Sequence, residues 1–167
     1  MDLTALLTRA RTSRFSRWLL QHVLNDRIPF NRPHGFRVEP LLGGGVRVHV
    51  PYWRINQNHI RGIHACALAT AAEMGSGLSV LERLDPRQYR LIMRSLHMDY
   101  HYQAKQNAAA TAIPDADALE RLETGLADQD SAEYTSVVRV EDKAGNHVAT
   151  GTVVWQVKPW TRVRTRA

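Results

Sequence analysis

The chain has 167 residues, 44% of them hydrophobic and 23% charged, a balance that fits one well-buried globular domain. Its formal net charge of +6 attracts anionic partners such as phosphates, nucleic acid or membrane headgroups without choosing among them. Cys66 is the only cysteine, which excludes an intrachain disulfide and a thiolate metal cluster and fits a reducing cytoplasm. No apolar run approaches the roughly 20 residues that span a bilayer, so we expect a cytoplasmic protein without a transmembrane segment.

An amphipathic helix between Thr12 and Asp26 is the first element that we expect. Its apolar face is formed by residues spaced three and four apart, namely Phe15, Trp18, Leu19, His22 and Val23. Pro29 and Pro33 then break the helical pattern. We therefore divide the chain into an N-terminal helix and linker (1–35), a main domain (36–160) and a basic tail (161–167).

A β-hairpin and a long helix open the main domain. Phe36–Leu42 and Val46–Tyr52 have strand character, and Gly43-Gly44-Gly45 between them can adopt the positive φ of a hairpin turn. The segment Ile63–Leu81 is rich in Ala and Leu and contains no proline, which predicts a helix that Asp85-Pro86 ends.

Extended segments dominate the rest of the chain. Strand patterns cover residues 91–103, 106–113, 134–140 and 147–157. The acidic segment 114–129 can form a helix or a surface loop. One long helix among antiparallel strands is an α+β pattern in which the sheet must wrap the helix. Because long exposed sheet edges invite aggregation, we expect them to pair across a two-fold axis in a homodimer or a dimer of dimers.

The helix over 63–81 carries the strongest functional candidate. It is small and apolar on nearly every side, which predicts burial, and Glu73 is its only formal charge. A buried carboxylate is costly unless it is paired, protonated or reached by water or ligand. An ion pair with Arg54 or Arg61 is the structural alternative. One narrow stripe would line a cleft, because its members fall at i, i+4, i+7 and i+11: Cys66, Thr70, Glu73 and Gly77.

Polar residues crowd the entrance of the same helix, namely Asn56, Gln57, Asn58, His59, Arg61 and His64. Free backbone N–H groups and the positive dipole end favour developing negative charge there, which predicts an oxyanion site. His64 lies nine residues before Glu73, about 13 Å along an ideal helix and half a turn around it, so the two cannot share a site within one chain. In a two-fold dimer, the helix start of one protomer can meet Glu73 of the other.

This run of residues resembles the signature of hot-dog fold acyl-CoA thioesterases of the phenylacetate-pathway type. That family has an Asn, a nearby Gly, His-Gly-Gly and an acid on the central helix, and the matching residues here are Asn58, Gly62, His64 and Glu73. Asn58 stands six residues before His64 and Glu73 nine after it, as in the family pattern. The order of elements agrees over roughly 36–157.

Three positions depart from that pattern. Ala65-Cys66 replaces the Gly-Gly, Gly62 sits one position later, and Glu73 stands where much of this branch has Asp. With its long basic N-terminal helix, the chain is more similar to poorly characterised thioesterase-like members of the superfamily.

The resemblance implies a hot-dog fold, in which an antiparallel sheet wraps one central helix, and a set of roles at the site. Glu73 would act as nucleophile or general base on the thioester, and the backbone N–H of Ala65 would polarise its carbonyl. Asn58 would position the water or the thioester, and His64 would orient this group. Substrate binding would fall to the neighbouring residues Gly62, Cys66, Thr70, Gly77 and Arg61.

Other patterns favour weaker alternatives. His97, Asp99 and His101 alternate on one strand face with metal-ligand chemistry, although one straight strand spreads them widely. Cys66 could act as a nucleophile beside His64. Aromatic residues near strands could stack on nucleic-acid bases, although core or cleft lining is the simpler interpretation: Tyr52, Trp53, Tyr100 and Tyr102. Basic residues could hold coenzyme A phosphates, namely Arg61, Arg94 and Lys105.

The sequence therefore predicts an acyl thioester hydrolase that acts on an acyl-CoA or an acyl-carrier thioester at a dimer interface. The first alternative is a non-catalytic acyl-thioester or fatty-acyl binding protein that uses the same cleft. A hydratase or dehydratase is the second. We expect no metal, no nucleic-acid partner and no cofactor, with coenzyme A present only as part of the substrate.

Overall fold

The computed structural model describes residues 2–163, in which one six-stranded antiparallel sheet is accompanied by four α-helices. The sheet order is β1-β2-β4-β5-β6-β3. The strands are β1 (Arg37–Pro40), β2 (Val46–Val50), β3 (Tyr89–Tyr100), β4 (Ala108–Ala112), β5 (Ala132–Asp142) and β6 (His147–Pro159). The helices are α1 (Leu3–Ala10), α2 (Arg14–Arg27), α3 (Ala65–Leu81) and α4 (Ala116–Asp128), with short 3-10 turns at Pro29–His34, Arg54–Asn56 and Trp160–Arg162.

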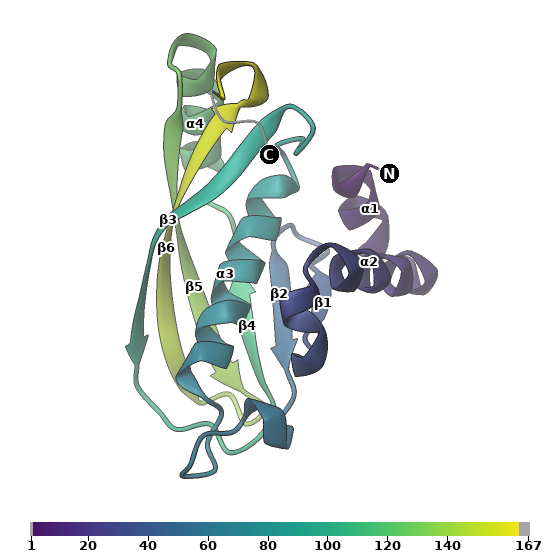
Figure 1. The fold of residues 1–167 in the computed structure, drawn as a ribbon, viewed down its shortest axis with the longest axis vertical. Helices are drawn as coiled ribbons and strands as arrows, with labels where there is room; N and C mark the ends of the chain where they lie inside the picture. The colour runs from purple at the N-terminus through teal and green to yellow at the C-terminus, as the bar shows by residue number, and fades with distance from the viewer. Residues whose placement is uncertain (1, 164–167) are drawn as a thin grey trace.

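The central helix α3 lies along one face of the sheet, and the strands curve around it (Figure 1). The helices α1 and α2 lie beside β1, whereas α4 lies at the other side of the molecule against β5. The α+β hot-dog architecture predicted from the sequence is confirmed.

Small residues let α3 approach the sheet closely. A Cβ added at Gly75 of α3 would lie 3.4 Å from Val48 Cγ2, and one added at Gly151 of β6 would lie 3.2 Å from Ala72 Cβ. Ala71 and Ala72 are completely buried. The Ala- and Gly-rich composition of this helix is therefore the condition for its contact with the strands.

The predicted hairpin is confirmed. Gly44 and Gly45 have φ values of 95° and 88°, and the N–H of Leu41 donates to the carbonyl of Gly45 at 2.9 Å. These positive φ angles are the conformation that glycine adopts without a steric cost.

The acidic segment 114–129, for which the sequence allowed a helix or a surface loop, forms the helix α4. The Asp115 side chain accepts a hydrogen bond from the N–H of Ala118 at the start of this helix.

The amphipathic helix predicted between Thr12 and Asp26 is confirmed as α2, whereas α1 was not predicted. Ser13 accepts a hydrogen bond from the N–H of Ser16 and caps the start of α2 at Arg14, which separates it from α1. The apolar face of α2 differs in part from the prediction. Phe15 and Trp18 are 69% and 55% exposed, and Leu20 and Leu24 are buried in the core, but Leu19 and Val23 of the predicted face also pack against it.

A spacing in the sequence could have revealed α1. Its apolar residues follow the i, i+3, i+4, i+7 pattern of an amphipathic helix, namely Leu3, Leu6, Leu7 and Ala10. The predicted boundary near residue 35 and the basic tail stay predictions, and residues 164–167 of that tail lie outside the described part of the chain.

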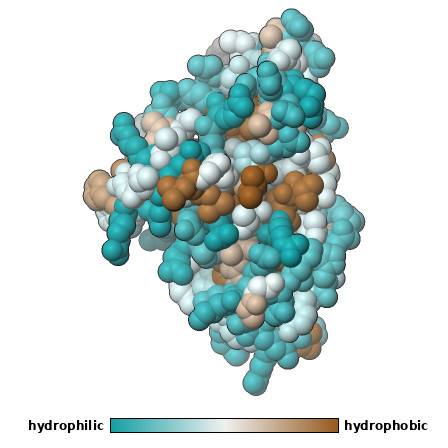
Figure 2. Space-filling view, turned by 180° about the vertical axis from the view of Figure 1, so that it is seen from behind, coloured by the Kyte–Doolittle hydropathy of each residue, from teal (hydrophilic) through white to brown (hydrophobic). Residues whose placement is uncertain are grey.

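The strand β3 forms one edge of the sheet and pairs only with β6 among the strands of residues 2–163. It has 12 residues, with a register shift between Met93 and Ser95, and much of its surface is exposed. Figure 2, which views the molecule from behind, shows a band of hydrophobic side chains across the middle of the surface. Val137 of β5 is exposed and alternates with the buried Ser136 and Val138, so its side chain projects from the outer face of the sheet. Among the helices of residues 2–163, none combines the length and apolar character needed to cross a bilayer.

Candidate active site

A tight loop precedes α3 and is organised by Asn58. The Asn58 Oδ1 accepts hydrogen bonds from the N–H groups of Ile60 and Gly62 at 3.1 and 2.9 Å, and the Asn58 N–H donates to the carbonyl of Gly62. Arg61, the loop residue between them, has a φ of 58°. The side-chain oxygen of Asn58 is therefore engaged in shaping the loop, which leaves the amide NH₂ as the part of this side chain available to a ligand.

His64 caps the N-terminus of α3. Its Nδ1 accepts a hydrogen bond from the N–H of Cys66 at 3.1 Å, and its own backbone N–H donates to the carbonyl of Asn56 at 2.7 Å. An accepting Nδ1 carries a lone pair, so the neutral ring holds its proton on Nε2. In this arrangement His64 orients the first turn of α3.

The backbone N–H of Ala65 is left without an acceptor by this cap. No hydrogen bond within residues 2–163 occupies it, and it stands at the positive end of a 17-residue helix. The carbonyl of Ala65 accepts a hydrogen bond from the hydroxyl of Tyr100 at 3.0 Å. A hollow of about 400 Å³ opens here, and its lining includes Asn58, Ala65 and Tyr100. Two of the predicted site residues, Asn58 and Ala65, are thus brought together.

Glu73 lies two turns further along α3 and is partly buried. Burial raises the pKa of its carboxyl above the ordinary value of 4.5, because desolvation disfavours the charged form. Ser76 Oγ donates to the backbone carbonyl of Glu73 and not to its side chain. No ion pair among the described residues engages the carboxylate, so the pairing with Arg54 or Arg61 that the sequence allowed is absent there.

The predicted stripe along α3 runs from the surface into the core. Cys66 is exposed. Thr70 is partly exposed, and its hydroxyl donates to the carbonyl of Cys66 at 2.8 Å. Gly77 is buried, and a Cβ there would lie 3.0 Å from Trp155 Cζ2. The first part of the stripe is open to a ligand, whereas Gly77 makes room for an indole ring.

Two residues at the hollow were not assigned a role from the sequence. Tyr100 was grouped with the aromatic residues that line a core or cleft, and its hydrogen bond to α3 could not be foreseen. Burial raises the pKa of its phenol. Gln103 packs against Gly62, where an added Cβ would lie 2.7 Å from Gln103 Cγ. No local sequence pattern marks either contact, because each joins segments more than 30 residues apart.

The strand residues with metal-ligand chemistry do not form a metal site in the described chain. His97 Nε2 lies 3.1 Å from Asp99 Oδ1, but His101 bonds Thr150 instead, with its ring 4.6 Å from that of His147. No cluster of three or more His, Cys, Asp or Glu side chains suited to a metal ion occurs within residues 2–163.

The sheet wrapped around α3, together with a polar helix entrance and an acid on that helix, defines a thioesterase-like hot-dog protein. A family model described as a domain of unknown function (DUF4442) matches residues 16–157. The chain belongs to that family.

Solved structures agree with this assignment. A protein of unknown function from Pseudomonas aeruginosa, a probable thioesterase, is 30% identical with a TM-score of 0.77, covering 85% of this chain and 95% of that chain. A protein of unknown function from Chlorobaculum tepidum is 15% identical with a TM-score of 0.75 over 90% and 98% of the two chains. A mutant thioesterase from Pseudomonas aeruginosa is 12% identical with a TM-score of 0.68 over 90% and 99%, and these last two show the fold alone. A search of curated proteins found no match.

Proposed function

We propose that the protein hydrolyses acyl thioesters, with acyl-CoA as the first substrate class to test. The observation that carries this proposal is Glu73, a partly buried carboxylate with a raised pKa and no ion pair among the described residues. A carboxylate with a raised pKa is a stronger base toward an attacking water than one with the ordinary pKa. The 30% identical relative described as a probable thioesterase adds support.

Two groups on α3 have separate roles in the proposed reaction, namely the backbone N–H of Ala65 and the carboxylate of Glu73. The thioester carbonyl accepts a hydrogen bond from the N–H of Ala65, which stabilises the oxyanion that forms when water attacks. Glu73 removes a proton from the attacking water. The tetrahedral intermediate then collapses, the carbon–sulfur bond breaks, and the proton held by Glu73 passes to the departing thiolate. The products are a carboxylic acid and a thiol, and no cofactor takes part beyond the coenzyme A portion of the substrate.

We place this site between two protomers. Ala65 and Glu73 are eight residues apart on one straight helix, about 12 Å along its axis, which is too far for both to contact one carbonyl. The start of α3 is exposed at Ala65 and Cys66, and the neighbouring edge strand β3 is long enough to pair with a second copy. A two-fold axis near β3 would bring the start of one α3 to Glu73 of the other.

The substrate's polar end would meet the loop before α3. The side chains of Arg61 and Lys105 are both exposed, and Arg61 lies within the loop that Asn58 closes onto Gly62. Their charges suit the phosphates of coenzyme A, and equally the phosphopantetheine of an acyl-carrier protein.

The first experiment measures thiol release from short, medium, long and aromatic acyl-CoAs. Glu73→Gln removes the base but keeps the side-chain volume. Ala65→Pro replaces the backbone N–H by a ring carbon and leaves the helix intact, because proline is tolerated at the first helical position and His64 already has the extended φ and ψ of −65° and 137° that proline requires before it. Ala65→Ser keeps the N–H and is the matched control.

We expect wild type and Ala65→Ser to turn over at least one thioester. Glu73→Gln and Ala65→Pro should each lose about 100-fold or more in kcat, the usual effect of removing a base or an oxyanion donor. Turnover that is equal in all four proteins would refute the hydrolase. Binding of acyl-CoA without turnover would instead establish the acyl-binding protein as the function.

Mixing the two inactive variants tests the interface. After subunit exchange, half of the dimers carry one Glu73→Gln and one Ala65→Pro chain, and a site shared between protomers is then intact once in each such dimer. Activity should recover to about a quarter of the wild-type value. If each site lies within one chain, no activity returns.

A further inference from the structure

A second cavity lies away from the candidate active site. It has a volume of about 720 Å³, lies between α1, the end of α2 and the end of α3, and is open to solvent on one side. Most of its lining is aliphatic and includes Leu3, Leu6, Val23, Ile28, Leu78 and Leu81. We call it the N-terminal chamber. Its volume falls in the range of 300 to 1,000 Å³ that is typical of small-molecule sites.

The chamber and the active-site hollow occupy opposite ends of α3. Ala65 is the first residue of this helix and Leu81 is the last, which separates them by about 24 Å along the axis. A ligand of moderate size in the chamber would therefore leave the N–H of Ala65 free. The chamber is a site of its own and not an extension of the hollow.

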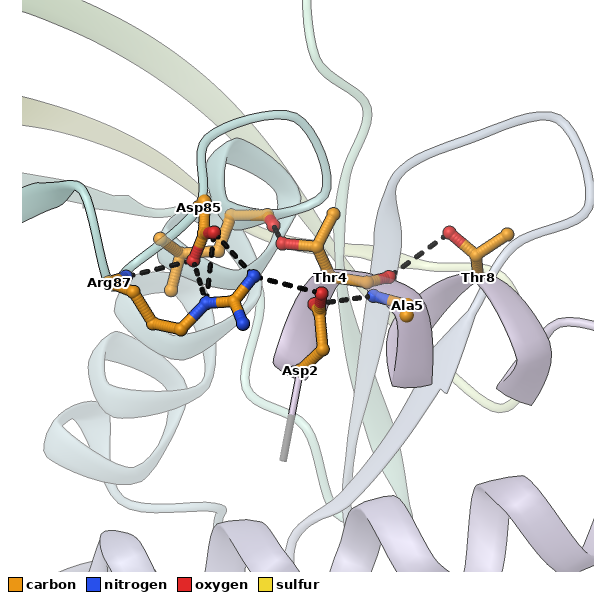
Figure 3. A network of polar contacts seen from close by, with 7 residues as sticks. Asp2, Thr4, Ala5, Thr8, Asp85 and Arg87 are labelled. Atoms are coloured by element: carbon orange, nitrogen blue, oxygen red, sulfur yellow. Dashed lines mark hydrogen bonds and ion pairs between the residues drawn. The ribbon is translucent and has the colours of Figure 1, made fainter.

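The wall formed by α1 is held by polar contacts at the end of α3 (Figure 3). Asp2 and Asp85 both contact the guanidinium of Arg87, at 3.1 and 2.7 Å, and the Thr4 hydroxyl donates to the carbonyl of Leu81 at 2.9 Å. These contacts fix α1 over the aliphatic lining. They also occupy the charge of Arg87, so this arginine is already neutralised by two carboxylates.

The remaining ionisable groups of the lining are His22, Asp26 and Arg27. His22 Nδ1 is bonded to the carbonyl of Trp18 at 2.8 Å. Arg27 lies in the last turn of α2, is exposed, and makes no ion pair with the described residues. The chamber thus combines an aliphatic interior with one guanidinium, that of Arg27, that is not paired with a carboxylate of the described residues, while Asp26 next to it keeps its own negative charge.

We propose that the N-terminal chamber binds a fatty acid, with its alkyl chain among the leucines and its carboxylate at Arg27. A linear chain matches an aliphatic interior that offers few hydrogen-bond partners. The single carboxylate matches the single unpaired guanidinium, which is suited to bidentate carboxylate binding. This site does not depend on hydrolysis at Glu73.

The experiment is isothermal titration of the full chain with saturated fatty acids of 8, 10, 12 and 14 carbons, kept below their micelle-forming concentrations. Burial of each added methylene should tighten Kd by about fourfold until the chamber is filled. The corresponding fatty alcohols test the charge contribution, because they have the chain but no carboxylate.

Two variants locate the ligand. Arg27→Gln should weaken fatty acids about tenfold and leave the alcohols unchanged, whereas Arg14→Gln, in the first turn of the same helix and outside the lining, should change neither. Ile28→Trp adds bulk to a partly exposed lining residue, so it should block both ligands without disturbing the core. Circular dichroism confirms that each variant is folded.

Three results would overturn the proposal. The first is the absence of binding to wild type, and the second is binding that Arg27→Gln and Ile28→Trp leave unchanged. The third is binding lost in Glu73→Gln but kept in Ile28→Trp, which would place the fatty acid in the catalytic cleft. A failure to detect thioester hydrolysis would refute the proposed enzyme function but not fatty-acid binding in the N-terminal chamber. The two proposals are therefore tested independently.

Discussion

The guanidinium of Arg11, one residue past the end of α1, contacts the carboxylate of Glu82, one residue past the end of α3, at 3.0 Å. The Glu82 side chain is 4% exposed, and its second oxygen accepts a hydrogen bond from the N–H of Gly45 at 2.7 Å. One buried carboxylate therefore joins the N-terminal helix, the central helix and the turn of the β1–β2 hairpin.

Arg11→Ala should lower the free energy of unfolding by about 2 to 3 kcal/mol, because it leaves the charge of Glu82 buried and unpaired. This loss is smaller than that of a fully buried pair because the Arg11 side chain is 25% exposed. Chemical denaturation measures the effect, and Arg9→Ala, an exposed arginine on α1, is the control. Equal small losses in both variants would show that the ion pair contributes nothing measurable.

The raised pKa of Glu73 makes stability depend on pH. Because the pKa of this acid is higher in the folded chain than its ordinary value of 4.5, the folded state is favoured by protonation. That contribution is fully present below 4.5 and is lost as pH rises through the folded pKa. Glu73→Gln should therefore have a higher Tm than wild type at pH 8 and about the same Tm at pH 4. A Tm difference that is constant with pH would contradict the assigned cause.

Gly77→Ala separates packing from substrate binding. The added Cβ would lie 3.0 Å from Trp155, whose indole N–H is held by the buried hydroxyl of Ser76 at 3.0 Å and has little room to move. We expect a net loss of about 1 kcal/mol, with overpacking exceeding the gain in helix propensity. Gly125→Ala in α4, where the nearest atom is at 3.6 Å, should instead gain up to about 1 kcal/mol. Unchanged stability with a higher KM would favour the role in substrate binding that was predicted for Gly77.

Tyr100→Phe tests whether the bond from β3 positions the start of α3. Loss of the hydroxyl removes the hydrogen bond to the carbonyl of Ala65, so the neighbouring N–H is held less rigidly. We expect kcat for thioester hydrolysis to fall about tenfold with little change in KM, since only the transition state depends on this alignment. Tyr102→Phe, in the lining of the same hollow, is the control. A rise in KM alone would make Tyr100 a substrate contact.

Patterns local in the chain could be predicted well. The glycine turn before β2, the proline-free helix α3 and the isolated charge of Glu73 each depend on residues close in sequence, and the structure places them as expected. The helix α2 was also predicted, whereas α1 was missed although its apolar residues follow a helical spacing. The buried face of α2 was predicted only in part, because Leu19 and Val23 pack against the core but Phe15 and Trp18 are exposed and Leu20 and Leu24 are buried instead.

The contacts between residues far apart in the sequence could not be predicted from local sequence patterns. Tyr100 reaches Ala65 across 35 residues, and Trp155 reaches Ser76 across 79. Such pairs are set by the register of β3 against β6 and by the depth at which α3 lies on the sheet. Neither property has a local sequence pattern.

The tight packing between α3 and the sheet also constrains how this family can diversify. Side chains on the inner face of the helix meet strands with almost no spare space, as at Gly75 and Ala72, so nearly every substitution there costs stability. The outward positions from Ala65 to Glu73 face no such restriction. New substrate preferences should therefore arise on one face of a single helix, while the opposite face stays nearly invariant among descendants that keep the fold.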